Sequence, residues 1–458
     1  MSQIYSYRNP VLSLWQAAVA EVHARRDSVK LRTAMVTAQR VETRPLAAAD
    51  DLMSPVHMVA AALSEHGSER NVRLLESDSV SLSLGEVLEN VALDCARTAA
   101  EFLLAEMKGD HDKARVLAGE LKYAECDILG WSECVTTYYA FKASGGDRPY
   151  RANINPVFDL DGKSRIAIIG DWGTGDEVAI NLLQQVASLK PEILIHLGDV
   201  YYAGTQQEEQ SNFLDICRQV LGSDIPLFSL CGNHDMYSGG NGYYWLVDHI
   251  GQQASYFCLR NGAWQFLAMD TGHNDNDPLT VGTNMTSLMT VGGWSESDWH
   301  LARIQEAEDR RTVLLSHHQL FSPFGSVGSV GSQPYAYNPA LFANFQGVLP
   351  KIAWWFWGHE HTLAVYDPYM GLQRGRCVGA SAVPVFTDQQ KYKNASGLQT
   401  FEGAPLPKWN RKGVLGDNGT DYAHGFAIMT LKGASANVDY YQVPVLRTAS
   451  RLPVTDAG

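Results

Sequence analysis

The chain has 458 residues, of which 45% are hydrophobic and 19% are charged, and its formal net charge is −14. This length and composition are typical of a folded globular chain with two or three domains. The negative charge would repel phosphate backbones, so the composition disfavours a protein that binds long nucleic acid, and a small ligand fits better.

The N-terminal stretch "MSQIYSYRNPVLSLWQAAVAEVHARR" lacks a basic leader followed by an apolar core and a cleavage site. We therefore expect no secretory signal. No apolar run approaches the ~20 residues that a membrane helix needs, so no membrane partner is expected. The cysteines are odd in number, dispersed and without a CxxC pair: Cys95, Cys126, Cys134, Cys217, Cys231, Cys258 and Cys377. They indicate reduced thiols of a cytoplasmic protein.

Residues 1–145 have helical spacing and almost no strand signal, which predicts an all-helical N-terminal region. Within 83–108, Ser83 and Glu86 have the spacing of a capping box, and apolar residues follow at steps of three and four. A second helix is expected over 112–142. We expect its aromatic end at Tyr138–Tyr139 to pack on the following domain; an independent partner-binding or oligomerisation module is the alternative.

The segment 144–156 is rich in Gly, Pro and Asn and is predicted to be a linker. Beyond it, short apolar strands alternate with helical stretches, which indicates an α/β domain over 160–445. The expected strands are "RIAIIGD", "EILIHLGD", "PLFSLCGNHD", "TVLLSHH" and "AWWFWGHEH". Two long polar stretches, 324–333 and 388–422, are either lids or tolerated insertions.

Polar residues follow each of these strands at the point where the apolar run ends. They are Asp171, Asp199, Tyr202, Asn233, His234, His317, His359 and His361. Carboxylate, imidazole and amide groups are ligands for cations such as iron, zinc or manganese. The His-x-His spacing places two rings on one side of the chain, because alternate residues face the same way. No cysteine lies in these motifs, which disfavours a thiolate zinc site.

The series D-x-G, G-D-x-x-Y, G-N-H-D, a strand ending in His, and G-H-x-H resembles the calcineurin-like metallophosphoesterase superfamily. The Gly in the first motif and the Tyr in the second resemble the purple acid phosphatases. The resemblance covers residues 164–382. It implies an α/β fold: a four-layer metallophosphoesterase-type β-sandwich flanked by helices. The N-terminal helical region has no counterpart in it.

The resemblance also implies two metal ions, iron paired with iron, zinc or manganese. One would be held by Asp171, Asp199, Tyr202 and His361, and the other by Asp199, Asn233, His317 and His359. Asp199 would bridge them. Tyr202 would bind as a phenolate in place of the histidine that ordinary members carry at the position of Gly173. That Tyr201 and Tyr202 exchange roles stays open.

Around the metals, the resemblance implies that Asn233 and His234 face the substrate and that His234 protonates the leaving group. Asp235 or a backbone carbonyl would orient the His234 ring. His318 is expected at the rim, in contact with the substrate, and His196 in the core.

The implied reaction is hydrolysis of a small phosphorylated substrate by a metal-bridging hydroxide, with a phosphomonoester favoured over a diester. A phosphodiesterase for cyclic nucleotides or small diesters is the alternative, and a non-catalytic scaffold is an alternative of another class. The complete ligand set favours an enzyme. The metal pair and the monoester preference stay open, because the chain lacks a secretory signal and has "QLFSPFGSVGSVG" after its two histidines. The oligomeric state is not predicted.

Overall fold

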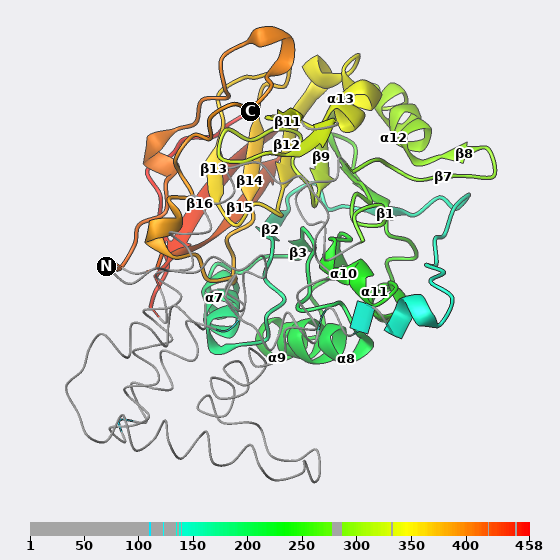
Figure 1. The fold of residues 1–458 in the computed structure, drawn as a ribbon, viewed down its shortest axis with the longest axis horizontal. Coiled ribbons are helices and arrows are strands. Elements are labelled where there is room, and N and C mark those ends of the chain that lie inside the picture. The colour runs from blue at the N-terminus through cyan, green and yellow to red at the C-terminus, as the bar shows by residue number, and fades with distance from the viewer. Residues whose placement is uncertain are drawn as a thin grey trace, which may run out of the picture. The chain divides into compact units, whose positions relative to one another are not determined.

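The computed structural model describes residues 140–276, 286–330, 333–419, 421–444 and 447–458, with the single positions 110, 122, 134, 137 and 138. The predicted helix over 83–108 and most of the one over 112–142 lie outside these residues. Residues 129–458 form a compact unit, shown in Figure 1. Among the helices that the structure describes, none has the length and apolar character needed to cross a membrane.

Two β-sheets form the centre of this unit. The first has seven strands, in the order β1 (Val157–Asp159), β5 (Phe257–Arg260), β6 (Trp264–Ala268), β9 (Arg311–Ser316), β12 (Ile352–Trp357), β14 (Gly375–Val378) and β13 (Leu363–Val365). The second has six, in the order β17 (Ser450–Arg451), β16 (Ser435–Val443), β15 (His424–Lys432), β2 (Arg165–Ile169), β3 (Ile193–His196) and β4 (Leu227–Ser229). All five strands expected from the sequence are present: β2, β3, β4, β9 and β12.

The two sheets pack face to face. Each strand contributes side chains to two cores, because successive side chains of a strand point to opposite faces of its sheet. In β2, Ile166 and Ile168 join the core between the sheets, while Ala167 and Ile169 join the core beneath the helices. In β12, Phe356 points into the core between the sheets, and Trp355 points to the outer face. Both sheets are therefore buried on two sides, which produces the four-layer arrangement that the family resemblance implies.

Helices cover the outer face of each sheet (Figure 1). The second sheet is covered by α7 (Glu177–Ser188), the π-helix η3 (Glu209–Leu214), α9 (Asp215–Leu221) and α11 (Asn241–Ile250). Two short helices lie next to these in sequence: α8 (Gln206–Glu208) precedes η3, and α10 (His234–Tyr237) follows β4. The first is covered by α12 (Glu296–Gln305) and α13 (Pro339–Phe345). Helix α7 begins after Asp176, whose Oδ1 accepts a hydrogen bond from Ala179 N at 2.9 Å.

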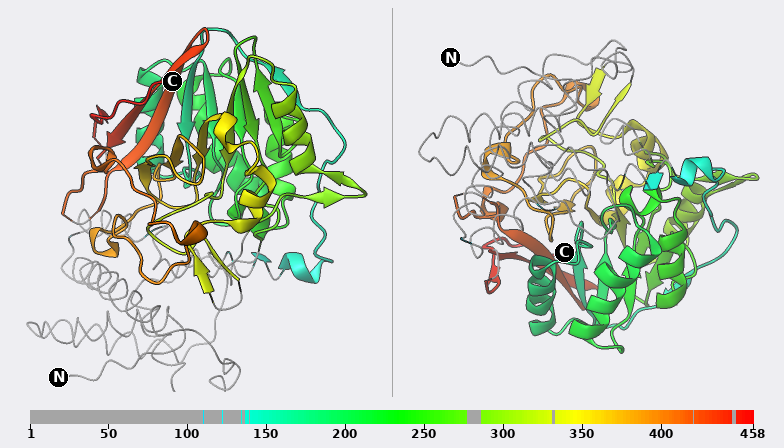
Figure 2. Two further views of the ribbon diagram at one scale, coloured as in Figure 1. Left: turned by 90° about the horizontal axis from the view of Figure 1, so that it is seen from above. Right: turned by 60° about the horizontal axis from the view of Figure 1, so that its bottom comes forward.

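The long polar stretches have local structure of their own. In the first, β10 (Gly328–Val330) pairs antiparallel with β11 (Gln333–Tyr335), which extends two residues beyond the stretch 324–333. Outside both stretches, β7 (Thr290–Val291) pairs with β8 (Trp294–Ser295). The remaining short 3₁₀ helices are η4 (Leu349–Lys351), η5 (Thr387–Gln389), η6 (Phe401–Gly403) and η7 (Arg411–Gly413). Figure 2 shows the connections between about residues 320 and 420, in yellow and orange, gathered on one side of the strands.

Paired strands and bridges extend past both predicted limits of the α/β domain, 160 and 445. Strand β1 begins at Val157, and Gly458 exchanges two backbone hydrogen bonds with Ala436 of β16.

The segment before the predicted linker also packs on this unit: Cys134, Tyr138 and Phe141 are buried. A Cβ added at Gly239, just after α10, would collide with the Phe141 ring.

This packing predicts different outcomes for two truncations. Deleting residues 1–142 removes the buried side chains of Tyr138 and Phe141, whereas deleting 1–128 keeps them. We expect the longer deletion to have a free energy of unfolding lower by about 3–6 kcal/mol than the shorter one. Urea unfolding of the two proteins measures this difference. Equal unfolding midpoints would show that residues 129–142 contribute nothing and would favour an independent N-terminal module.

Candidate metal centre

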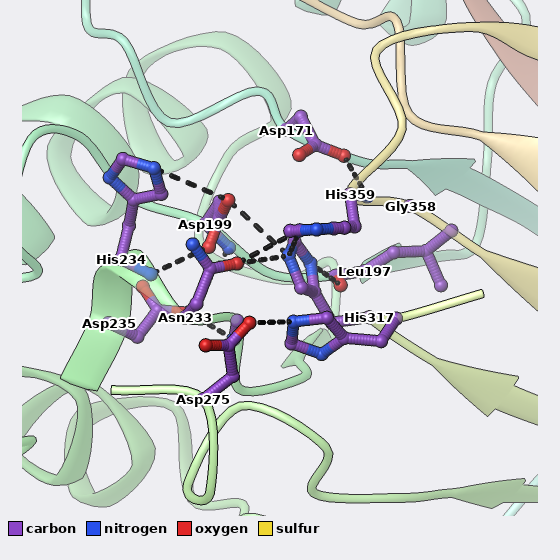
Figure 3. Close-up of polar contacts among 12 residues, drawn as sticks. Asp171, Leu197, Asp199, Asn233, His234, Asp235, Asp275, His317, Gly358 and His359 are labelled. Carbon is purple, nitrogen blue, oxygen red and sulfur yellow. Dashed lines mark hydrogen bonds and ion pairs between the residues drawn. The ribbon is translucent and has the colours of Figure 1, made fainter. Parts of the chain in front are cut away.

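Five strands place polar side chains at one edge of the sandwich. Strands β2, β3 and β4 are parallel neighbours in one sheet, and β9 and β12 are parallel neighbours in the other. Their carboxyl ends therefore meet at the same edge of each sheet. The side chains that follow them converge between the sheets, as Figure 3 shows: Asp171, Asp199, Asn233, His317 and His359.

The backbone at these strand ends is strained. Asp171, Asp199 and His359 have φ values of 55°, 74° and 62°, in the left-handed region that non-glycine residues rarely adopt. Such strain is concentrated at functional sites. Close packing adds to the constraint, because a Cβ at Gly232 would collide with Asp199 Oδ1 and one at Gly358 would lie 2.7 Å from Asp171 Oδ2.

One group of ligand atoms surrounds the hydroxyl of Tyr201. Tyr201 Oη lies 3.2 Å from Asp171 Oδ1, 3.3 Å from Asp199 Oδ2 and 3.2 Å from His361 Nε2. His361 Nε2 is 3.4 Å from Asp171 Oδ1. The predicted first ligand set is thus assembled, with Tyr201 in the place that the sequence analysis assigned to Tyr202.

A second group lies around His317. Its Nε2 is 3.3 Å from Asp199 Oδ2, 3.0 Å from Asn233 Oδ1 and 3.2 Å from His359 Nδ1. His359 Nδ1 is 3.0 Å from Asn233 Oδ1. The Asn233 amide is oriented by its Nδ2, which donates to Tyr237 Oη at 2.6 Å, and the carbonyl oxygen therefore faces the histidines. This is the predicted second set, and Asp199 Oδ2 is common to both groups.

The charges of the site are coupled through Asp199, which is 1% exposed. Burial acts to raise the pKa of Asp199, but His317 and His234 hold it well below its ordinary value. Burial acts to lower the pKa of His317, but Asp199 raises it to about 9. Burial and the Asp171 carboxylate raise the pKa of Tyr201 well above its ordinary value, so its phenolate needs a nearby positive charge.

The donor set fits two cations. Oxygen and nitrogen ligands lie about 2.1 Å from a zinc-like ion, which places neighbouring ligand atoms about 3–3.4 Å apart. The contacts within both groups fall in this range, between 3.0 and 3.4 Å. Among the described residues, Asp171, Asp199 and His317 form one set that could hold an ion, and His317, His318 and His359 another. Carboxylate, imidazole, amide and phenol groups suit iron, zinc or manganese.

The ring of His234 is held by the backbone. Its Nδ1 lies 2.6 Å from the Tyr202 carbonyl oxygen, so Nδ1 carries the hydrogen and Nε2 faces Asp199 Oδ2, 3.9 Å away. Asp235, predicted as a catalytic or orienting residue, does not touch this ring. Its carboxylate accepts from the backbone N–H groups of Asp199, Val200 and Gly232 and so shapes the loops that carry the ligands.

The structure brings Tyr201 into the first ligand group, where the prediction had Tyr202. Tyr201 Oη contacts three of the predicted ligands: Asp171, Asp199 and His361. The Glu208 carboxylate accepts from the backbone N–H groups of Tyr202, Ala203 and Thr205 and so holds the loop after β3. The prediction counted residues after β3 along the G-D-x-x-Y motif, but the conformation of the loop after β3 determines which tyrosine ring enters the site.

His318 is not at the rim, contrary to the prediction, because it is 4% exposed and both ring nitrogens are engaged. Nδ1 lies 3.0 Å from Thr271 Oγ1, and Nε2 lies 3.0 Å from Asp275 Oδ2. The sequence analysis missed Thr271 and Asp275. They follow the buried strand β6, so the same rule of polar residues at strand ends would have found them. His196 is buried, as expected for a core residue.

The tyrosine assignment can be tested by colour. A phenolate bound to ferric iron absorbs visible light, whereas a phenolate on Zn(II) or Mn(II) does not. We expect iron-loaded, air-oxidised protein to show such a band, Tyr201→Phe to lose it, and Tyr202→Phe to keep it, because Tyr201 Oη lies among the ligands. Visible spectroscopy of the three proteins measures this. Loss of the band in Tyr202→Phe alone would restore the assignment made from spacing.

Comparisons with known proteins show which proteins part of the chain resembles. Residues 164–363 match the family model described as calcineurin-like phosphoesterase. Among solved structures, a purple acid phosphatase from yellow lupin (Lupinus luteus) is 12% identical with a TM-score of 0.40, over 62% of this chain and 52% of that chain. A dimetal phosphatase from Danio rerio is 14% identical with a TM-score of 0.39, over 64% and 99%. GAP50 of Plasmodium is 12% identical with a TM-score of 0.41, over 65% and 90%. No curated protein sequence matches the chain.

Proposed function

Because residues 164–363 match the family model described as calcineurin-like phosphoesterase, we propose that this chain is a hydrolase that cleaves small phosphomonoesters with two metal ions. One observation carries the proposal: two groups of ligand atoms, each with contacts of 3.0–3.4 Å, share Asp199 Oδ2. Iron with iron, zinc or manganese suits the donor set, and a tyrosinate favours at least one ferric ion.

When bound, a pair of cations supplies Lewis acidity that polarises the phosphoryl oxygens and activates water. The residues of the chain provide position and protons. Asn233 directs its carbonyl oxygen into the site because Tyr237 holds its amide nitrogen. His234 presents Nε2 toward the same space because the Tyr202 carbonyl holds Nδ1–H. In its protonated form, His234 would donate the Nε2 proton to the leaving oxygen, which is the role of a general acid.

Access to the site supports a small substrate. Asp171, Asp199, Asn233 and His317 are at most 1% exposed, whereas the His361 side chain is 24% exposed. A terminal phosphoryl group on a small molecule can approach from the His361 side. An internal phosphate of a long, charged chain would have to bring its flanking groups into a buried centre of a protein with net charge −14.

A substrate panel with metal analysis tests the proposal. The purified chain would be analysed for metal, reconstituted with Fe, Zn or Mn, and assayed with phosphomonoesters, bis-aryl diesters and cyclic diesters. We expect bound metal and faster turnover of monoesters. Faster turnover of diesters would support the phosphodiesterase alternative. A protein that is purified without metal, and that hydrolyses none of these substrates after metal is added, would be identified as a non-catalytic scaffold.

We also propose a reducing compartment, the cytoplasm, which fits the five described cysteines, all buried free thiols.

A further inference from the structure

Glu360 stands between the two histidines of the G-H-x-H motif and belongs to neither group of candidate ligands. His359 and His361 each contact members of those groups. The Glu360 carboxylate instead accepts hydrogen bonds from Ser322 Oγ and from Tyr366 Oη, the latter at 3.3 Å. This side chain therefore connects the turn that carries the two histidines to other parts of the chain.

The hydrogen bond between Ser322 and Glu360 joins two loops that carry ligands of the same group. Ser322 lies in the loop after β9, which begins with His317, and Glu360 lies in the loop after β12, next to His359. His317 Nε2 and His359 Nδ1 are 3.2 Å apart in the second group (Figure 3). Ser322 is fully buried, and its Oγ also accepts a hydrogen bond from Phe324 N at 2.9 Å. The hydroxyl group is therefore held in place, and its bond to Glu360 ties the two loops together.

Three buried aromatic rings support both donors of these hydrogen bonds. Phe321, the neighbour of Ser322, packs edge to face against Trp357, the last residue of β12, with ring centroids 5.1 Å apart. The Tyr366 ring stacks on Trp357 with centroids 5.5 Å apart and meets Phe321 edge to face at 5.3 Å. All three side chains are at most 2% exposed. Close packing of this kind restricts the positions from which the two hydroxyl groups reach Glu360.

The backbone beside Glu360 is the strained part of this turn. His359 has a φ of 62°, and its N–H donates to Asp171 Oδ2 at 2.8 Å. A backbone in such a conformation persists only where the surrounding structure holds it. The Glu360 carbonyl oxygen accepts from Thr362 N and lies 3.3 Å from Cys377 Sγ. Glu360 is thus held through both its carbonyl oxygen and its carboxylate, directly next to the strained residue.

We propose that Glu360 is a positioning residue of the metal centre: by accepting the hydrogen bond from Ser322 Oγ, it holds the loop after β12 against the loop after β9 and so fixes His359 opposite His317. The inference rests on the proposed function, because it concerns how the same site holds its metals. Residues that orient metal ligands through hydrogen bonds typically change metal affinity by about 10–100-fold when they are replaced.

Zn(II) affinity, measured by competition with a chromophoric chelator and without any substrate, tests this role in the full chain. Glu360→Ala and Ser322→Ala are each expected to bind at least one Zn(II) ion about 10–100-fold more weakly than the wild type. Glu360→Gln keeps the shape and an oxygen that can accept from Ser322 Oγ, so it is expected to retain most of the affinity. Ser326→Ala is the matched control, because Ser326 is exposed and its Oγ donates to Gly328 O at 2.7 Å. It should bind Zn(II) like the wild type.

The double variant Glu360→Ala/Ser322→Ala shows whether the two residues act through one contact. We expect it to bind Zn(II) no more weakly than Glu360→Ala alone, because residues that share a hydrogen bond have non-additive effects. Losses that add in the double variant would overturn the proposal, as would a Glu360→Gln protein that loses as much affinity as Glu360→Ala. If Glu360→Ala does not fold, Ser322→Ala and Glu360→Gln still decide between these outcomes.

Thermal unfolding of the same proteins separates positioning from a purely structural role. A lower unfolding midpoint with wild-type Zn(II) affinity in Ser322→Ala and Glu360→Ala would refute the positioning role and leave the proposed hydrolase intact. Weaker Zn(II) binding in these variants of a chain that hydrolyses no phosphoester would support the positioning role and contradict the proposed function. A wild-type chain that binds no Zn(II) would refute both.

Discussion

Asp199→Asn is expected to lose at least one metal and to reduce turnover by more than about 10²-fold, which exceeds the 10–100-fold typical of residues that only orient a ligand. Asp199 Oδ2 lies 3.3 Å from Tyr201 Oη in one group and 3.3 Å from His317 Nε2 in the other. Removing its charge leaves two cations facing each other with less compensation. The shape is preserved, because an Asn oxygen can still accept from His234 N as Asp199 Oδ1 does, at 3.0 Å.

Metal content by elemental analysis and turnover of an aryl phosphate measure this effect, with thermal unfolding as the check on folding. Asp176→Asn is a matched control, because Asp176 caps helix α7 and contacts none of the ligands in the structure. The control should keep its metals and activity, with a loss of about 0.5–2 kcal/mol in stability at most. An Asp199→Asn protein with full metal content and near-normal turnover would contradict the bridging role.

His234→Ala is expected to keep its metals and to lose about 10²–10⁴-fold in turnover of substrates with poor leaving groups. The ring contributes no ligand to either group, since its Nδ1 contacts the Tyr202 carbonyl and its Nε2 stays 3.9 Å from Asp199 Oδ2. What the variant lacks is the proton for the leaving oxygen. Activated aryl phosphates need little protonation, so their hydrolysis should fall much less.

Turnover of an alkyl and an activated aryl phosphate, compared in the same preparation, measures this dependence on the leaving group. His249→Ala is the control, because His249 Nδ1 also contacts a backbone carbonyl, that of Trp245 at 2.7 Å, but its ring is exposed. It should behave like the wild type. An equal loss of activity for both leaving groups, or loss of metal, would mean that His234 is a ligand or a structural residue.

Most of the site could be predicted from the sequence because the relevant signals are local. Apolar runs such as "ILIHLG" mark buried strands, and the polar residue that follows marks the strand end. Asp171, Asp199, Asn233, His317, His359 and His361 all follow such runs, and the structure brings them together. The alternation within β2 likewise follows from the two-residue period of a strand, which sends Ile168 to one core and Ile169 to the other.

Residues in turns could not be placed in this way, because the period of a strand ends where the strand ends. The ring of Tyr201 enters the site although the spacing indicated Tyr202, and both residues lie in the loop after β3, whose backbone is held by Glu208 from the next helix. Asp235 and His318 have the right residue types, but their side chains are engaged by backbone amides and by Thr271 and Asp275. Apart from Gly232, their partners come from other strand ends, so sequence proximity carried no information about those contacts.

The sequence by itself determined the strands, their polar ends and the ligand chemistry, because each of these depends on neighbours a few residues apart. Only the tertiary structure decided that β2, β3 and β4 lie in one sheet and β9 and β12 in the other, so that the candidate metal centre spans the two. It also decided that Tyr392 lies against β13, where its Oη donates a hydrogen bond to Leu363 O, 29 residues earlier in the sequence. Contacts of this kind depend on how distant segments pack, and local patterns do not encode that packing.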